Sequence, residues 1–506
     1  MFNIGDYFTW VKKNIRIRDY FSYKIIALLF FATRLINLDK FPIFTDEGIY
    51  IRWARVAWHD ANWRFISLTD GRQPLQTWLT IPFLKFFPDN LLLGGRLFAV
   101  LSGFIALIGL FVLVYYLFGK RASLIAGLLY VLTPFFLFYD RLALVDSMVN
   151  AGFIWGLFFL ILLARTQRLD VAFLYGLTMG MTLLAKSSAR VFMITGMVTP
   201  ILFLQKNWRG FGKKALNFFL LFGFSAFLAL VIYNVQRLSP FFHFVEEKNK
   251  TFVMTLDQFR QTPFMRFPTN IWLIPQLIFA ETAYVLSFLG LGGLVLLIKK
   301  NGQLGLYFLL WILIPYLALS FFAIVVYARY LIFLTTLLLI LAAYLLSNLK
   351  KNLFILCSLA FLISVSFFNY TILFKMDRIP LPGFDKWQYV EGISAGTGIK
   401  EIVDYARSRS TEKPVIILAE GNFGVVGDML ESSLKSTDKI SIKGFWPLEE
   451  KNLWESQPLV EDNVVLVVFA HRTEFPGIWP INLIKKYDKP GGKSSFTLFE
   501  LKPKER

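Results

Sequence analysis

The sequence contains few of the residues on which disulfide and metal chemistry depend. It has one cysteine, Cys357, so an intramolecular disulfide cannot form. Its three histidines, His59, His243 and His471, lie far apart, and we expect no metal centre built from histidine and cysteine. Charged residues make up only 17% of the chain, whereas soluble proteins carry roughly a quarter. The composition therefore argues against a soluble protein.

Apolar residues take the place of the missing charges. The chain of 506 residues is 56% hydrophobic and 17% aromatic. Its apolar residues fall in runs close to the roughly 20 residues that a helix needs to cross a bilayer. The expected fold class is thus a polytopic α-helical membrane protein with about eleven spans, the fifth and sixth being the weakest predictions. They lie near residues 23–38, 92–117, 121–138, 145–164, 171–185, 190–205, 215–234, 278–298, 305–323, 328–347 and 353–374.

Lysine and arginine gather in every second loop between these runs. If the N-terminus is cytoplasmic, the inside loops are basic and almost free of acids, as the positive-inside rule requires. Their basic residues are Lys120, Arg121, Arg165, Arg168, Lys206, Arg209, Lys213, Lys214, Lys299, Lys300, Lys350 and Lys351. The formal net charge of +19 is therefore explained by membrane topology and not by nucleic-acid binding. We expect a multi-pass protein of the cell membrane with a cytoplasmic N-terminus.

The two long outer loops and the C-terminal region differ in composition from the spans. Residues 39–91 and 236–277 mix Trp, Phe and Arg with aliphatic residues, which favours helices lying in the membrane interface over plain surface loops. Within the first loop, the helical stretches are 49–58 and 75–84. We therefore expect residues 1–374 to form a membrane domain that includes these interfacial helices.

Residues 375–506 have the composition of a soluble domain, placed outside by the odd number of spans. They alternate between apolar strand patterns and helical patterns, which predicts an α/β domain. The expected strands are 415–419, 464–469 and 497–501, and the expected helices are 399–407, 424–434 and 481–487. Gly421 to Gly424 follow a strand but lack the spacing and the lysine of a phosphate loop, so an ordinary βα turn is expected.

Four polar groups on the outer face need an explanation, because charges at membrane depth persist mainly where they pair or line a functional cavity. The first is the acidic pair Asp46-Glu47 after the first span. A carboxylate there could remove a proton from an attacking hydroxyl; alternatively, it caps a helix that begins near Gly48. The second is Arg72, whose fork of donors suits a phosphate. Alternatively, Arg72 is a turn residue whose head reaches the interface.

The other two groups stand at the ends of later spans. Arg141 and Asp146 flank the turn between the third and fourth spans, where helix capping or a surface ion pair is the alternative. Arg329 and Tyr330 begin the tenth span, where an arginine either anchors the helix among headgroups or reaches an anionic lipid head. Together these residues suit displacement at a sugar carbon that bears a phosphate leaving group. A carboxylate activates the incoming hydroxyl, and arginine neutralises the charge on the departing phosphate.

At these residues the sequence resembles the GT-C superfamily of membrane glycosyltransferases. The likeness is to the branch of protein O-mannosyltransferases and lipid A aminoarabinose transferases, which is glycosyltransferase family 39-like. It spans roughly residues 23–350 and rests on the order of four short motifs: Asp46-Glu47, "Arg-Gln-Pro-Leu" from Arg72, "Arg-Leu-Ala-Leu-Val-Asp" from Arg141, and "Ala-Arg-Tyr" at Tyr330. The resemblance implies the GT-C fold and a donor sugar linked to polyprenyl phosphate. It also implies action outside the cytoplasm and inversion at the anomeric carbon.

The resemblance also implies roles for individual residues. Asp46 takes the place of the catalytic carboxylate, and Glu47 supports it. Arg72 matches a position where relatives carry lysine in a Lys-Pro-Pro-like context, taken to contact the lipid phosphate. Arginine for lysine and Gln73 for the first proline are departures from that pattern, although the basic charge is kept.

Further positions follow the same family pattern. Asp146 matches the second acidic position, with Arg141 and Tyr330 beside it on the substrate side. Arg329 matches the late basic position on the donor phosphate. Oligosaccharyltransferases of the superfamily use a divalent cation and the monosaccharide branch generally does not, so we expect no catalytic metal and no cofactor.

Two other functions fit the same residues. A transporter or lipid-linked-sugar flippase could use them as a substrate path, and a scaffold could bind a partner through its outer α/β domain. Transporter sites lie near the membrane midplane between repeats, whereas this sequence shows no internal repeat and its polar groups collect at one face. A scaffold leaves the carboxylates unexplained. The expected partners are therefore a polyprenyl-phosphate-linked sugar, an acceptor (protein, lipid or polymer) and membrane lipids, with no nucleic acid.

Overall fold

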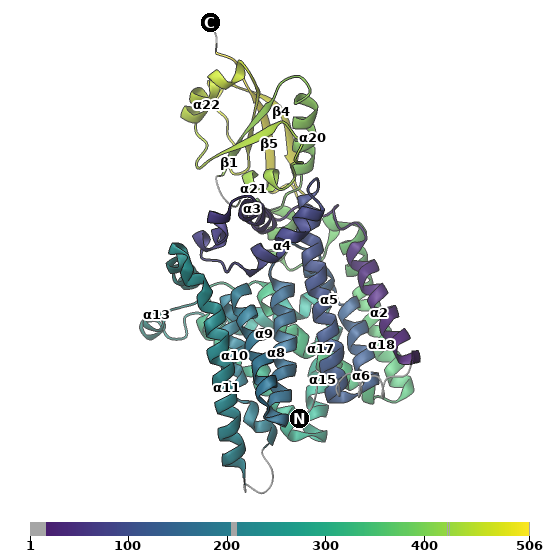
Figure 1. The fold of residues 1–506 in the computed structure, drawn as a ribbon. Coiled ribbons are helices and arrows are strands. Elements are labelled where there is room, and N and C mark those ends of the chain that lie inside the picture. The colour runs from purple at the N-terminus through teal and green to yellow at the C-terminus, as the bar shows by residue number, and fades with distance from the viewer. Residues whose placement is uncertain (1–16, 204–209, 422–423, 425, 505–506) are drawn as a thin grey trace.

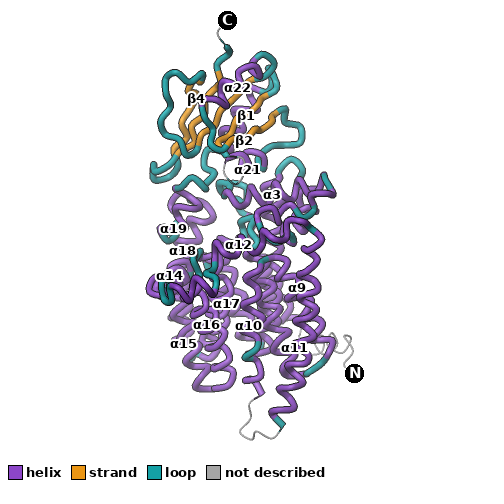
Figure 2. Tube along the Cα trace, turned by 90° about the vertical axis from the view of Figure 1, so that its left-hand side faces the viewer, coloured by secondary structure: helices purple, strands orange, loops and turns teal. Residues whose placement is uncertain are grey.

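The computed structural model describes residues 17–203, 210–421, 424 and 426–504. It consists of a bundle of long helices and a small sheet with its own helices at one end of that bundle (Figure 1). Shorter helices lie between the two parts, and Figure 2 shows α3 and α12 in this middle layer. Three predicted site residues, Asp46, Glu47 and Arg72, belong to this layer, and Asp146 lies at the start of α8.

The bundle helices coincide with the apolar runs of the sequence. In chain order they are α2 (Ile17–Leu35), α5 (Leu91–Phe118), α6 (Lys120–Leu132), α7 (Pro134–Tyr139), α8 (Asp146–Thr166), α9 (Leu169–Ala185), α10 (Arg190–Gly196), α11 (Phe211–Tyr233), α14 (Phe267–Glu281), α15 (Val285–Lys300), α16 (Gly302–Phe322), α17 (Ile332–Asn348) and α18 (Lys351–Phe374). Short 3-10 segments, η3 (Ser187–Ala189), η4 (Thr199–Phe203) and η7 (Ala328–Leu331), flank α10 and precede α17. The apolar runs thus predicted helix positions well.

By length and composition, six helices of the described residues can cross a membrane, or seven if the bent pair α14–α15 is one span. Helix α9 and the stretch Ser187–Phe203 are apolar but shorter. The total of about eleven spans therefore stays a prediction.

Three predicted spans are wrong as single helices: 121–138 is divided between α6 and α7, 190–205 between α10 and η4, and 278–298 between α14 and α15. The run 278–298 is broken: α14 ends at Glu281, α15 begins at Val285, and the two axes differ by 113°. Ala283 and Tyr284 make the break with φ angles of 53° and 64°. Neither residue is glycine or proline, and the polar pair Glu281-Thr282 directly before them is the sequence signal at the break.

The middle layer is built from the two long outer loops. The predicted interfacial stretches 49–58 and 75–84 are confirmed as helices, since they lie in α3 (Thr45–His59) and α4 (Leu75–Phe86). The other elements of the layer are η1 (Ala61–Trp63), η2 (Ile66–Asp70), η5 (Asn234–Leu238), η6 (Pro240–His243), α12 (Phe244–Phe252) and α13 (Leu256–Gln261).

The C-terminal region forms a five-stranded mixed sheet of order β2-β1-β3-β5-β4. Strand β1 pairs in parallel with β2 and β3, and β5 pairs antiparallel with β3 and β4. The strands are β1 (Val415–Glu420), β2 (Ile440–Phe445), β3 (Val464–Phe469), β4 (Ile481–Asp488) and β5 (Ser495–Leu501). The helical elements are η8 (Met376–Arg378), α19 (Gly383–Lys386), η9 (Trp387–Glu391), α20 (Ile399–Arg409), α21 (Val426–Glu431), α22 (Glu450–Ser456) and η10 (Gln457–Val460).

Three predicted strands of this region are confirmed, whereas the predicted helix 481–487 is wrong. That segment is the edge strand β4. Ile481, Ile484 and Tyr487 are its half-buried residues, and their spacing of three imitates a helix. Ile481 packs against the cluster on one face of the sheet, and Ile484 and Tyr487 pack against the cluster on the other face. The register shift between Leu483 and Lys485 lies between these two groups.

The sheet is packed on both faces, and one face reaches the membrane part of the chain. On one side α20 and α21 cover β1 and β3, and Ile43, which precedes α3, joins this buried cluster. On the other side Leu448, Leu453 and aromatic residues of the β3–β4 connection cover the sheet. The C-terminal region is therefore packed onto the start of α3.

Candidate active site

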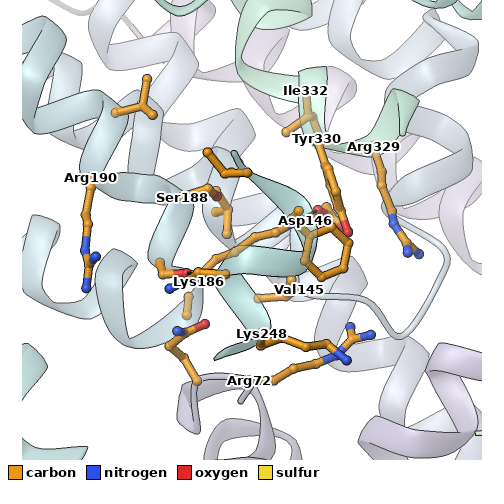
Figure 3. A pocket seen from close by; sticks show the side chains of 18 of the residues that line it. Arg72, Val145, Asp146, Lys186, Ser188, Arg190, Lys248, Arg329, Tyr330 and Ile332 are labelled. Carbon is orange, nitrogen blue, oxygen red and sulfur yellow. Dashed lines mark hydrogen bonds and ion pairs between the residues drawn. The ribbon is translucent and has the colours of Figure 1, made fainter. Parts of the chain in front are cut away.

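A cavity of about 380 Å³ lies where the middle layer meets the bundle. Its walls come from α3, the turn at 71–73, the starts of α8 and α10, α12, and the segment 323–333. Figure 3 shows basic side chains reaching the cavity from several of these elements. The cavity brings together five predicted site residues: Asp46, Arg72, Asp146, Arg329 and Tyr330.

Asp46 lies in the first turn of α3, where a carboxylate is stabilised by the positive end of the helix dipole. Its Oδ2 accepts a hydrogen bond from Arg329 Nη2 at 2.8 Å, and its Oδ1 lies 3.6 Å from Arg72 Nη2. Burial by itself would raise the pKa of Asp46, but Arg72 and Arg329 outweigh burial and hold the pKa below its ordinary value of 3.8. In the free protein this carboxylate is therefore ionised and held between two arginines.

Arg72 is held by two neighbours besides Asp46. Its Nε donates to Asp70 Oδ2 at 3.0 Å, its Nη1 donates to the Tyr50 hydroxyl at 2.9 Å, and its guanidinium lies over the Tyr50 ring. Asp70 in turn accepts a 2.6 Å hydrogen bond from Lys248 Nζ. The labelled ends of Arg72 and Lys248 lie side by side in Figure 3, so two cations from different loops meet at this wall.

Asp146, at the start of α8, faces a second cation. Lys186 Nζ donates to Asp146 Oδ1 at 2.7 Å and lies 3.8 Å from the centre of the Tyr330 ring. Figure 3 shows these three side chains together. Burial lowers the pKa of Lys186 despite the attraction of Asp146. An acid, an ammonium and an aromatic ring thus form a second group in the cavity, next to Arg329.

Glu47 is next to Asp46 in the sequence but lies outside the cavity. Both of its carboxylate oxygens accept hydrogen bonds from Arg96, each at 2.8 Å, and both side chains are fully buried. Glu47 also accepts the backbone N–H groups of Phe44 and Ala143. The expected helix cap is therefore made by Glu47, and the helix begins at Thr45 instead of Gly48.

Arg141 also lies outside the cavity. Its guanidinium donates to the backbone carbonyls of Thr33, Arg34, Ile36 and Asn37, the end of α2. The structure thus places the residue as a brace for this helix end. Its position beside Asp146 in the sequence does not bring the two side chains to one place.

Sequence reasoning missed several cavity residues. Tyr50, Lys186, Arg190 and Lys248 all line the cavity. Lys186 carried a usable signal, because it is a basic residue in a short loop that the topology places outside, against the positive-inside rule. Lys248 carried none, since it stands in a long polar loop.

A metal site is not evident in the described part of the chain. There, no group of three or more His, Cys, Asp or Glu side chains lies close enough to hold a metal ion. The carboxylates at the cavity, Asp46 and Asp146, are paired with cations instead.

Comparisons with known proteins agree with the sequence resemblance. A family model described as dolichyl-phosphate-mannose-protein mannosyltransferase matches residues 72–233. The crystal structure of ArnT from Cupriavidus metallidurans bound to undecaprenyl phosphate is similar, with a TM-score of 0.61 at 13% identity over 95% of this chain and 97% of that chain. The apo state of the same protein gives 0.60 at 12% identity over the same shares.

The crystal structure of the Archaeoglobus fulgidus oligosaccharyltransferase in complex with Zn and sulfate is also similar. Its TM-score is 0.52 at 12% identity, over 88% of this chain and 67% of that chain. Comparison with curated protein sequences gave no match. The chain therefore has the GT-C fold in its ArnT-like form, and the resemblance to GT-C glycosyltransferases is confirmed. The matches and the apolar helices support an integral membrane protein of the glycosyltransferase type.

Proposed function

We propose that this protein is an inverting glycosyltransferase. It moves a monosaccharide from a polyprenyl-phosphate donor to an acceptor hydroxyl on the non-cytoplasmic face of the membrane. The observation that carries the proposal is the ionised Asp46, held between Arg72 and Arg329 at one wall of a cavity beside the bundle. ArnT with bound undecaprenyl phosphate shares the fold, which supports the choice of donor.

The reaction follows from the chemistry of these groups. Asp46 removes the proton of the acceptor hydroxyl as its oxygen attacks the anomeric carbon. The bond between that carbon and the phosphate oxygen breaks, and the electron pair leaves with the lipid phosphate. Arg72 and Arg329 offset the growing negative charge. The products are the glycosylated acceptor, with inverted configuration, and polyprenyl phosphate.

A carboxylate with a lowered pKa is a weak base, and donor binding resolves this difficulty. The donor phosphate competes with Asp46 for the same two guanidinium groups. Once Arg72 and Arg329 turn toward the phosphate, less positive charge acts on Asp46 and its pKa rises. Donor binding therefore makes the base stronger at the moment when the acceptor is to be deprotonated.

The group of Asp146, Lys186 and Tyr330 suits the neutral part of the substrates. Asp146 can accept hydrogen bonds from sugar or acceptor hydroxyls, and the Tyr330 ring offers an apolar face to a sugar. Lys186 keeps Asp146 from standing as an unpaired charge. Asp146 is in this proposal a binding residue, and Arg141 and Glu47 stabilise the helix ends that frame the cavity.

The test is the Asp46→Asn variant in purified protein. Transfer from a polyprenyl-phosphate sugar should fall by about 10²–10⁴-fold, while expression, thermal stability and binding of undecaprenyl phosphate stay near the parental values. Asp60→Asn, a half-buried acid in the same loop that does not line the cavity, is the control and should leave turnover unchanged. Unchanged turnover in Asp46→Asn contradicts the role of this residue.

Two further experiments separate the alternatives. Mass spectrometry of glycolipids and glycoproteins with and without the protein identifies sugar and acceptor, whereas movement of a lipid-linked sugar across proteoliposomes without product favours a flippase. Treatment with EDTA should leave transfer unchanged. Loss of transfer that Mn²⁺ restores contradicts a reaction without a catalytic metal.

A further inference from the structure

Helix α3 presents a different face to each of three parts of the molecule. Residues three and four apart share a helix face, so its first three turns form three stripes. The cavity stripe consists of Asp46 and Tyr50. The bundle stripe consists of Glu47, Ile51 and Ala54. The C-terminal stripe consists of Gly48, Arg52 and Arg55. The helix that carries the proposed base is thus held from two other sides.

The C-terminal stripe packs closely against α21. A Cβ atom on Gly48 would lie 3.0 Å from the backbone C and O of Asp428 and from the backbone N of Met429. The Ser432 hydroxyl donates to the Gly48 carbonyl at 3.1 Å. Because the neighbours are backbone atoms, they cannot rotate away from a larger side chain. Glycine at position 48 therefore sets how close α21 comes to the helix, two residues from Asp46.

Charged side chains fix the same contact. Arg52 lies 3.2 Å from Asp428 Oδ1 and 3.2 Å from Glu431 Oε2, and Arg55 lies 3.3 Å from Glu431 Oε2. Asp428 also accepts the backbone N–H of Gly424 at 2.8 Å. The arginine side chains are about one-third exposed, so each pair adds modestly to stability. Their geometry nevertheless fixes the rotation of α3 against α21.

The turn before α21 contributes to this contact. A Cβ atom on Gly424 would lie 3.2 Å from the Ile49 side chain, and its φ of 76° favours glycine. Gly424, in the glycine motif after β1, thus has a packing role. On the other side of Asp46, the Thr45 N–H and hydroxyl both donate to the Ser394 carbonyl, each at 3.0 Å.

We propose that the C-terminal region is a positioning element of the active site, which holds Asp46 in register with Arg72 and Arg329 through the contact of Gly48 and Arg52 with α21. This inference rests on the proposed function of Asp46. None of the contact residues lines the cavity, so they act through the placement of α3 and touch no substrate. They are positioning residues, and their loss should lower kcat while donor binding stays.

The experiment uses the whole chain and three variants of the contact. Gly48→Ala forces α3 and α21 apart by a few tenths of an ångström, and kcat should fall about 3- to 10-fold, since misplacement by 1 Å costs on the order of 10²-fold. The KM for the polyprenyl-phosphate donor and the thermal midpoint should change little. Arg52→Ala should act in the same direction, and Arg52→Lys should recover part of the loss.

Two matched controls separate positioning from general damage. Gly223→Ala adds the same methyl group to a helical glycine with open space around it, and Arg409→Ala removes an ion pair with Glu500 inside the C-terminal region. Both should keep parental kcat. The proposal is wrong if Gly48→Ala and Arg52→Ala keep the parental kcat. It is also wrong if the kcat of these variants falls only in proportion to their fraction of folded protein, because loss of folded protein then explains the whole effect.

A readout without turnover separates this inference from the proposed function. Infrared difference spectroscopy, with Asp46→Asn as the blank, reports protonation of Asp46 itself. The groups that face this carboxylate are Arg72, Arg329, Lys248 and Tyr50. Gly48→Ala should raise the pH at which the Asp46 signal titrates, because α3 moves relative to the arginines. An unchanged titration contradicts the positioning role, whereas a wild-type protein that transfers no sugar contradicts only the proposed function.

Discussion

Two charged networks lie on either side of a single peptide bond, and they differ in almost every physical respect. Asp46 faces the cavity and shares two arginines with its surroundings, at 2.8 and 3.6 Å. Glu47 is sealed in the protein with Arg96, and each of its oxygens is hydrogen-bonded. One residue along a helix rotates a side chain by about 100°, which here separates a carboxylate at the cavity from a closed structural support.

The difference shows how a membrane enzyme can hold charge at the edge of the bilayer in two ways. A sealed pair must be complete, because each partner left alone is a buried charge. In a network that lines a cavity, the cations can keep hydrogen-bond donors that an incoming anion can reach. The Arg34–Asp140 pair, also fully buried, belongs to the first kind, and the Lys186–Asp146 pair belongs to the second.

The largest expected effect breaks the sealed network. Arg96→Met leaves the Glu47 carboxylate buried without its cation and should destabilise the fold by about 3–5 kcal/mol. Unfolding in detergent, followed by heat or denaturant, measures this loss. Glu47→Gln combined with Arg96→Met should recover most of it, since the amide oxygen still accepts a backbone N–H. If Arg96→Met is as stable as Asp46→Asn, which should keep nearly the parental stability, the ion pair of Glu47 with Arg96 is not required for the fold and the prediction is wrong.

The sequence could predict much of this architecture but not the separation of the two networks. Hydrophobic runs predicted the helices, since each membrane-spanning helix needs an apolar surface of fixed length. The basic loops predicted a topology in which Asp46, Arg72, Asp146 and Arg329 lie at the same end of the bundle. The helix phase at Asp46 was not predictable, because it depends on where α3 begins. At that start Glu47 accepts the backbone N–H of Phe44, and the same carboxylate is paired with Arg96 of α5, a residue distant in the sequence.

Other features depend on contacts between distant segments. Arg141 is an arginine beside an acid in the sequence, yet its partners are four carbonyls at the end of α2. Lys248 reaches Asp70 across 178 positions of sequence. Neither partner leaves a local pattern, so only the folded chain assigns these residues. The motifs fix which residues are candidates, and packing decides which of them meet.

The second prediction concerns the cavity network alone. Arg72→Gln should lower kcat by about 10²–10³-fold, the typical cost of removing one donor to a developing anion. Arg72→Lys keeps the charge but loses the forked guanidinium that contacts both Tyr50 and Asp70. Its activity should therefore lie between those of the parental protein and Arg72→Gln. Thermal stability should stay near the parental value in both. If Arg72→Gln and Arg72→Lys lose stability as much as activity, Arg72 has a structural role like that of the buried Glu47–Arg96 pair.

The third prediction is a pH dependence that only the open network should show. Because the pKa of Asp46 is lowered, kcat/KM should show no acid limb at or above pH 3.8, the ordinary aspartate value. In Arg72→Gln that limb should move to higher pH, since one of the cations that lower the pKa is gone. The acid limb of kcat should lie at a higher pH than the acid limb of kcat/KM. Bound donor phosphate occupies Arg72 and Arg329, so less positive charge lowers the pKa of Asp46 in the donor complex. Coincident limbs would contradict competition between phosphate and Asp46.

The smallest expected effect lies at the rim of the cavity, where Lys248 ties α12 to Asp70. This pair is partly exposed, and such pairs contribute roughly 0–1 kcal/mol. Lys248→Gln should therefore change stability little, while the donor KM rises modestly because a cation next to Arg72 is lost. The effect should shrink as salt is added, since screening weakens attraction between exposed charges and an anionic donor. A salt-independent loss of turnover would instead mean that Lys248 contacts the reacting groups, and would extend the open network to α12.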